Sequence, residues 1–216
     1  MNERAKPEKV LSPAKVPVPE RVLVIACGMI AREILAVRDR YGFDHLELTC
    51  LPAEFHYRPE RIAPAMDKAI REARAQGYRH IFAGYADCGT GGGLDRVCEK
   101  HGVERIEGPH CFAFYQGLSR FEAVAEADML SFYMTDFICR QFDAFFMKPM
   151  GLDRHPELIQ DFFGNYQKLV YLAQTEDPAL EAVAQKAARL LGLAYEKRQT
   201  GYGDLPAALA GALQKH

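Results

Sequence analysis

The chain alternates between short apolar runs and longer stretches in which apolar residues recur at helical spacing. Short apolar or alternating runs predict strands, and apolar positions at i, i+3, i+4 and i+7 predict amphipathic helices. The predicted strands cover residues 21–27, 45–51, 80–85, 103–106, 131–135, 167–173 and 194–198. The predicted helices cover residues 29–41, 59–76, 94–100, 111–127, 136–146, 156–163 and 178–191, with a last helix from residue 204.

This alternation indicates βαβ units, whose crossover connections are right-handed. The pattern therefore predicts an α/β fold, with a mostly parallel sheet and flanking helices in a Rossmann-like or flavodoxin-like three-layer arrangement. In such sheets ligands bind at the carboxyl ends of the strands. The residues that follow the strands are therefore the first candidates for a functional site.

Residues 1–20 are rich in Pro and Lys and show no hydrophobic periodicity, which predicts a flexible N-terminal arm. Residues 21–216 are predicted to form a single α/β domain. With 216 residues and 49% hydrophobic composition, the chain is long and apolar enough for one well-buried core.

The formal net charge is −2 and the Lys and Arg residues are scattered, which argues against a nucleic acid or a membrane surface as the main partner. No apolar run approaches the roughly 20 residues that a membrane span needs, and no secretory signal is present. These features predict a cytoplasmic protein. In a reducing compartment the six cysteines are expected to be free thiols.

Two predicted strand ends carry a cysteine followed by a glycine, namely Cys27 with Gly28 and Cys88 with Gly89. The glycine allows a sharp turn into the next helix, and the amino end of that helix favours a thiolate. A thiolate binds metals or attacks electrophiles, so both cysteines are candidate ligands and Cys88 is a candidate nucleophile. The alternative is that small residues simply fit a tight turn.

The loop after Cys88 consists of Gly89, Thr90, Gly91, Gly92 and Gly93. A loop with so few side chains lets a ligand approach the backbone closely, and its amides can form an anion-binding nest. These residues are therefore candidates for cofactor binding. The loop is neither a P-loop nor a dinucleotide fingerprint, because the Lys-Ser/Thr pair and the glycine spacing are missing. A flexible surface loop is the alternative.

A third candidate block follows the fourth predicted strand, where His110 and Cys111 open a helix. Cys27, Cys88 and Cys111 could supply three thiolates, with His110, His56 or an exogenous ligand as the fourth. Three protein ligands with one open position are typical of a catalytic zinc site. Three thiolates would equally suit an iron–sulfur cluster with one open iron. No CxxC spacing strengthens either interpretation.

Other polar residues near these blocks are secondary candidates. Tyr85 and Asp87 flank Cys88, where Tyr85 could contact a cofactor and Asp87 could orient a ligand or bind substrate. His56, in the loop after the second strand, could act as a base. Cys98 and Cys139 fall within apolar helical segments, so we expect them to be inert thiols and not ligands.

On these residues the sequence resembles the family of domain of unknown function 1638. The resemblance covers about residues 20–205, and the segments that carry it are residues 26–28, 84–89, 108–111, 131–133, 163–166 and 169–171. It implies an association with genes for corrinoid-dependent methyltransferases, cobalamin-binding proteins and corrinoid reactivation proteins. Many members have an acidic residue between the His and Cys of the third block, so which of His110 and Cys111 faces the site stays open.

Three functions follow as hypotheses. The first is a metal-binding accessory protein or enzyme in corrinoid-dependent methyl transfer and one-carbon metabolism, with zinc or an iron–sulfur cluster as cofactor. The second is a metal-free thiolate enzyme that uses Cys88. The third is a non-catalytic module that binds a corrinoid or a cobalamin-binding protein. The expected partners are such a corrinoid protein, a small-molecule ligand and, as an oligomer, other copies of the chain.

Overall fold

The strands lie in two sheets in which every neighbouring pair is parallel. The computed structural model describes residues 21–214, so the predicted N-terminal arm lies outside the described residues. The first sheet has the order β2-β1-β3-β4, with strands β1 (Val22–Cys27), β2 (Leu46–Leu51), β3 (His80–Gly84) and β4 (Glu104–Arg105). The second has the order β5-β6-β7, with strands β5 (Ser131–Thr135), β6 (Lys168–Ala173) and β7 (Ala194–Gln199).

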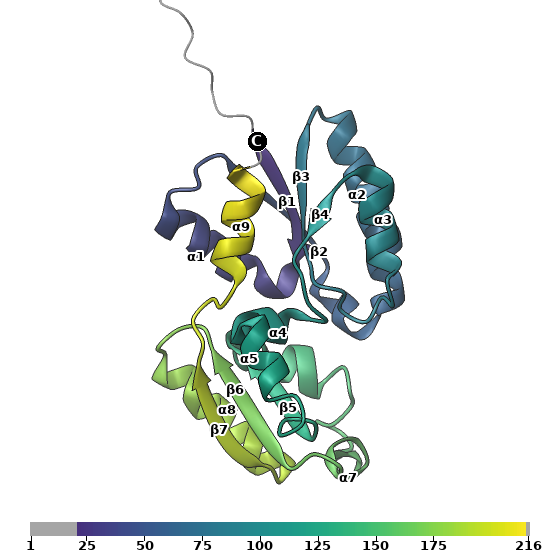
Figure 1. Cartoon of the computed structure of the whole chain (residues 1–216). Helices are drawn as coiled ribbons and strands as arrows, with labels where there is room; N and C mark the ends of the chain where they lie inside the picture. Colours follow the sequence, from purple (N-terminus) through teal and green to yellow (C-terminus); the bar gives the residue numbers. More distant parts are fainter. Residues whose placement is uncertain (1–20, 215–216) are drawn as a thin grey trace, which may run out of the picture.

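Helices flank both sheets, which confirms the prediction of a mostly parallel three-layer α/β fold (Figure 1). The α-helices are α1 (Ala31–Tyr41), α2 (Ile62–Ala75), α3 (Gly93–His101), α4 (Cys111–Gln116), α5 (Leu118–Ala123), α6 (Asp136–Arg140), α7 (Ile159–Phe163), α8 (Pro178–Leu191) and α9 (Leu205–Gln214). The shorter 3-10 segments are η1 (Gly28–Ile30), η2 (Ala53–Tyr57), η3 (Pro59–Arg61) and η5 (Pro156–Leu158), and η4 (Phe142–Met147) is a π-helix.

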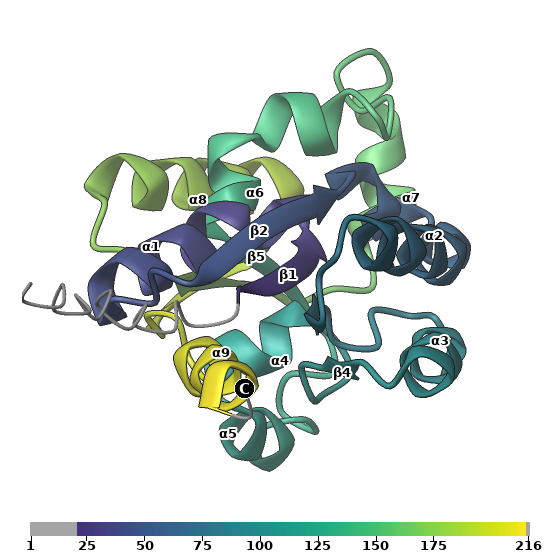
Figure 2. The same cartoon turned by 90° about the horizontal axis from the view of Figure 1, so that it is seen from above.

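The alternation of side chains along β1 shows how the layers form. Val22, Val24 and Ala26 belong to one buried cluster, whereas Leu23 and Ile25 belong to another. Successive strand residues point to opposite faces of a sheet, so an uninterrupted apolar run is buried on both faces. Helices α2 and α3 cover one face, and α1 and α9 lie over the other (Figures 1 and 2).

The two sheets share a continuous core. The cluster that begins with Val22 and Val24 extends to Leu169 and Tyr171 of β6 and to Leu209 of α9. After the second sheet the chain returns, and α9 packs beside α1 of the first sheet (Figure 1). The last helix therefore packs against the first α-helix of the described chain.

Besides small shifts in the bounds of other elements, and first turns of the 3-10 type in the helices predicted for residues 59–76 and 156–163, the structure differs from the predicted elements at three places. The helix predicted for residues 111–127 is broken at Gly117, whose φ of +85° ends α4 before α5 begins. The helix predicted for residues 136–146 changes to a π-helix after Gln141. The segment between β2 and α2, predicted as a loop, contains η2.

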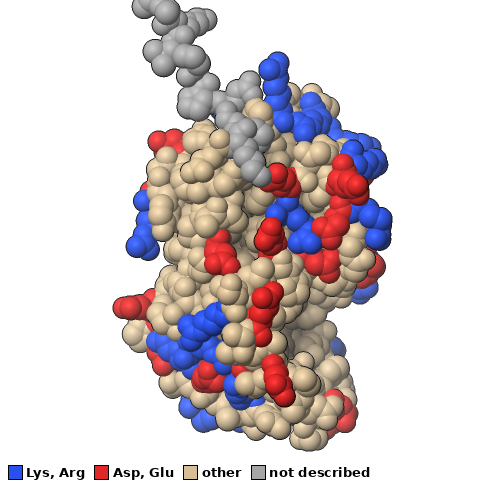
Figure 3. Space-filling view, in the orientation of Figure 1, with Lys and Arg blue, Asp and Glu red and all other residues tan. Residues whose placement is uncertain are grey.

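The surface carries no strong separation of charge on the face shown in Figure 3, where basic and acidic side chains are interspersed. None of the helices in residues 21–214 combines the length and the apolar character needed to cross a membrane.

Candidate functional site

Three cysteines from three neighbouring strand ends of the first sheet line one cavity of about 190 Å³. Cys27 is the last residue of β1, Cys88 lies in the loop after β3, and Cys111 opens α4 after β4. Both His110 and Cys111 line the cavity, so both residues face the site. The structure thus brings the three predicted thiol ligands to one place.

Strands β1 and β3 approach each other closely beside this cavity. Gly84 is the register partner of Ala26, and a Cβ atom on Gly84 would lie 2.7 Å from the Ala26 Cβ. Real Cβ atoms do not come so close, so only glycine fits at this position. Gly84 itself lines the cavity.

Cys88 is held in a left-handed backbone conformation, with a φ of +51°, and no other non-glycine residue within residues 21–214 has a positive φ. This conformation costs a residue with a Cβ atom roughly 1–2 kcal/mol. Two hydrogen bonds hold it: the Asp87 N–H donates to the Gly108 carbonyl at 3.1 Å, and the Cys88 N–H donates to the Pro109 carbonyl at 2.8 Å. Strain of this kind is concentrated at functional sites.

The glycine loop folds around the side chain of Asp87. The Asp87 carboxylate accepts hydrogen bonds from the Thr90 hydroxyl at 2.7 Å, the Gly92 N–H at 3.0 Å and the Gly91 N–H at 3.3 Å. The predicted anion nest is therefore filled by the chain's own carboxylate. Of the loop candidates, only Gly89 lines the cavity, and Gly91 is exposed. Asp87 accordingly shapes the loop that presents Cys88.

The thiols are protonated in the metal-free protein. Burial raises the pKa of Cys27 and of Cys111, and it raises the pKa of Cys88 to about 12. The negative charge of a Cys27 thiolate contributes to the raised pKa of Cys88, and the charges of Cys88 and Cys27 contribute to that of Cys111. The three groups are thus electrostatically coupled, as side chains around one cavity must be.

Two further polar side chains in the cavity wall have buried polar atoms: the Tyr85 hydroxyl interacts with the Cys27 thiol, and His110 Nδ1 has no hydrogen-bond partner among the described residues. Burial lowers the pKa of His110, so its imidazole is neutral at pH 7. His56 also lines the cavity, and its ring contacts Phe112, with the centroids 6.3 Å apart. An unpaired buried polar atom is costly unless a ligand satisfies it.

Within residues 21–214, no three His, Cys, Asp or Glu side chains are already placed to hold a metal ion together. A metal would have to draw the thiols closer together than they stand in this structure. The donor set suits such an ion, because thiolates and imidazoles are the ligands of zinc, and thiolates those of iron–sulfur clusters. By the chemistry of its side chains the cavity fits either cofactor.

A second, larger cavity of about 620 Å³ adjoins the thiol cavity, and the two share His56, His110 and Phe112 as a wall. Aromatic side chains line much of it, among them side chains from α5, β5 and α7. This cavity was not predicted from the sequence. The dense aromatic residues of segments 112–121, 132–133 and 162–166 were the available signal.

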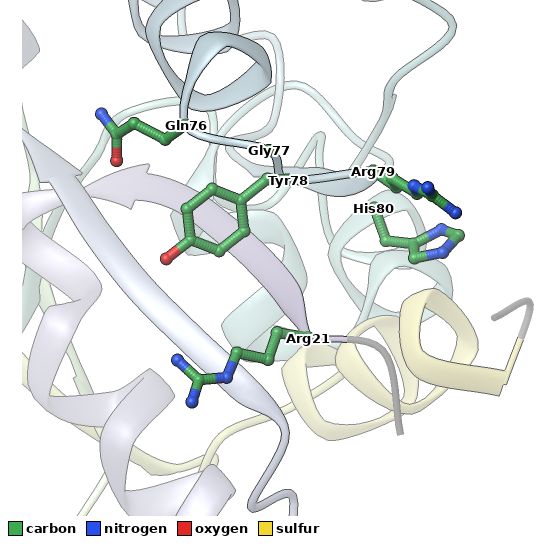
Figure 4. Close-up of a pocket in the computed structure, with 6 residues that line it drawn as sticks. All are labelled: Arg21, Gln76, Gly77, Tyr78, Arg79 and His80. Carbon is green, nitrogen blue, oxygen red and sulfur yellow. The ribbon is translucent and has the colours of Figure 1, made fainter. Parts of the chain in front are cut away.

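Another pocket lies at the opposite, amino-terminal edge of the first sheet, between the residues that precede β1 and β3 (Figure 4). It contains no thiol, and Arg21 at its border pairs with Glu47. The cysteine blocks are all at the other edge of the sheet, so this pocket is separate from the candidate site.

The predicted non-ligand cysteines are placed apart from the cavity. Cys98 lies in α3 and Cys139 in α6, both are buried, and neither lines the thiol cavity. Burial raises the pKa of Cys98 to about 11 and that of Cys139 to about 12.

Comparison with known proteins gives one match. The family described as "Protein of unknown function (DUF1638)" matches residues 50–209, a range that includes Cys88 and Cys111 and begins after Cys27. No curated protein and no solved structure matches the chain.

Proposed function

The chain belongs to the DUF1638 family, and we propose that it binds a metal centre, a zinc ion or an iron–sulfur cluster, through Cys27, Cys88 and Cys111. The observation that carries the proposal is that three cysteines far apart in sequence line a single cavity at the carboxyl edge of one sheet. Cysteines that serve only as small core residues have no reason to gather there. His110 is the fourth candidate ligand.

The chain's own residues prepare this centre in distinct ways. The hydrogen bonds from Asp87 and Cys88 to residues 108–109 join the loop after β3 to the segment that carries His110 and Cys111. Apolar side chains, including Ile30 and Phe114, form part of the wall around the thiols. A bound zinc would supply a Lewis acid, whereas a cluster would supply a one-electron redox couple.

A metal-free thiolate enzyme is the weaker alternative. It would need a thiolate at Cys88 at neutral pH, but burial raises the pKa of that thiol to about 12. Catalytic cysteines lie in electropositive surroundings, and no Lys or Arg lines this cavity among the described residues. A metal cation would itself deprotonate its thiol ligands.

Metal analysis of protein purified without oxygen tests the proposal. We expect about one equivalent of zinc, or iron with sulfide and absorption near 400 nm, in the wild type. Cys27→Ala, Cys88→Ala and Cys111→Ala should each lose most of it. Cys98→Ala is the matched control, since it removes a buried thiol outside the cavity. A wild type free of zinc and iron would contradict the proposal, as would metal loss in Cys98→Ala with metal retained in Cys88→Ala.

For this centre we further propose a role in corrinoid-dependent methyl transfer and one-carbon metabolism, as an accessory protein or enzyme acting with a cobalamin-binding partner. The support is the genetic association that the family resemblance implies. Mixing the metal-loaded protein with a cobalamin-binding protein tests it. We expect the absorption spectrum of the corrinoid to change with the wild type and not with Cys88→Ala. An unchanged spectrum with both, in either redox state of the corrinoid, would reject the role.

A further inference from the structure

The aromatic cavity beside the thiols has the size and lining of a small-molecule site. Its volume of about 620 Å³ falls within the roughly 300–1,000 Å³ of known ligand clefts. Six aromatic side chains form much of its wall: Phe112, Phe121, Phe132, Tyr133, Phe163 and Tyr166. Ring faces bind other planar rings by offset stacking and edge-to-face contact.

The wall of this cavity has no net charge to offer a ligand. No Lys or Arg is among the described residues that line it. Its one carboxylate, Asp128, is engaged by Arg198 at 2.9 Å, Lys168 at 2.9 Å and the Tyr133 hydroxyl at 2.7 Å. An anion would therefore find no cation to pair with, and its charge would lose hydration without compensation.

Two neutral polar groups in the wall have no partner among the described residues. Ser131 is 8% exposed, and its hydroxyl is buried without a hydrogen bond. His110 Nδ1 is likewise buried and unpaired. Both residues line the aromatic cavity. A buried polar atom left without a partner is destabilising, so a ligand with a hydrogen-bonding group would be held at this wall.

Large apolar side chains also surround the opening of the cavity. Met129, Phe162 and Tyr166 line it and are 73%, 48% and 38% exposed. Exposed apolar side chains gathered at one opening mark an interaction site more often than scattered ones do.

We propose that this cavity binds a planar ring compound that bears no negative charge and carries at least one hydrogen-bonding group, through stacking on its aromatic wall and hydrogen bonds to Ser131 and His110. Because His56, His110 and Phe112 separate it from the thiol cavity, the ring lies next to the proposed metal centre. The binding itself does not require the metal.

Two probes with one ring skeleton test the inference on metal-free, full-length protein: uncharged 2-naphthol and anionic 2-naphthoate. The chain has no Trp, so naphthol fluorescence can be followed without tryptophan background. We expect 2-naphthol to bind at one site per chain, at least tenfold more tightly than 2-naphthoate. Tighter binding of 2-naphthoate, or no binding of 2-naphthol, would overturn the proposal.

Variants locate the bound probe. Tyr166→Ala and Ser131→Ala should each weaken 2-naphthol binding about 3- to 10-fold, whereas Tyr41→Ala, which removes an exposed aromatic residue outside the cavity, should leave it unchanged. Tyr166 is partly exposed, so its removal should leave the fold intact, and circular dichroism checks this. Equal affinity in all three variants would place the probe elsewhere and overturn the proposal. Because the protein in this experiment is metal-free, a failure of 2-naphthol to bind would not bear on the proposed metal centre.

Discussion

The left-handed conformation of Cys88 makes a prediction about stability that separates backbone strain from the loss of a thiol. Replacing Cys88 with Ala removes the sulfur but keeps the Cβ atom that is strained at a φ of +51°. Replacing it with Gly removes both. Since each variant loses the same sulfur, the difference between them measures the strain at this position.

The magnitude follows from two opposing effects. Relief of the left-handed strain stabilises the Gly variant by roughly 1–2 kcal/mol. The greater freedom of Gly in the unfolded chain lowers the free energy of unfolding by about 0.4–1 kcal/mol. Cys88→Gly should therefore be about 0.5–1 kcal/mol more stable than Cys88→Ala. The matched pair at Cys98, in the right-handed helix α3, should reverse the order, with Gly about 1 kcal/mol less stable than Ala.

Urea denaturation of the four metal-free variants, followed by circular dichroism under reducing conditions, measures these differences from the unfolding midpoints. The same pairs can be compared by thermal melting, where 1 kcal/mol corresponds to about 2–4 °C for a chain of this size. If Gly is less stable than Ala at position 88 by the same amount as at position 98, the left-handed conformation is not present in solution. The inferred role of residues 108–109 in holding it would then fail too.

Three further predictions concern the neighbouring interactions. Asp87→Ala should lower the free energy of unfolding by about 1–3 kcal/mol in urea titrations, because three donors lose their acceptor, while Asp87→Asn should retain part of it. Hydrogen bonds from Arg198 and Lys168 hold the pKa of Asp128 well below its usual range. The ionised Asp128 therefore contributes its full stabilisation above pH ~4, and this stabilisation is lost as the pH falls below that value. Asp128→Asn should accordingly make the urea midpoint depend less on pH between about 2 and 5. Cys98→Ala should cost about 1 kcal/mol and leave the metal content of the protein unchanged.

Much of the fold could be predicted from the hydrophobic pattern. The strand at residues 131–135 and the helix at residues 178–191 were predicted with the bounds that the structure has. Both have strong local signals: a short apolar run, and a periodic segment that begins at Pro178 and ends before Gly192. The division into two sheets could not be predicted, because the pairing of strands depends on contacts between distant segments and not on their own patterns.

For the candidate site, sequence identified the residues better than their roles. Because the carboxyl ends of parallel strands meet at one edge, the cysteines at positions 27, 88 and 111 were expected to lie together, and they line one cavity. The glycine loop was expected to enclose a ligand, whereas Asp87 occupies its amides. The aromatic cavity could not be predicted, because its rings come from separate helices and strands and each ring alone has the pattern of an ordinary core residue.

The most direct test of the proposed metal centre is X-ray absorption spectroscopy of the protein as purified without oxygen, measured at the zinc or iron edge. Coordination by Cys27, Cys88 and Cys111 predicts sulfur neighbours at about 2.3 Å from the metal, three of them thiolates for zinc, with one fewer in any variant that still holds the ion. A first shell of nitrogen and oxygen alone, at about 2.0–2.1 Å, would contradict the account and place the metal away from the three cysteines.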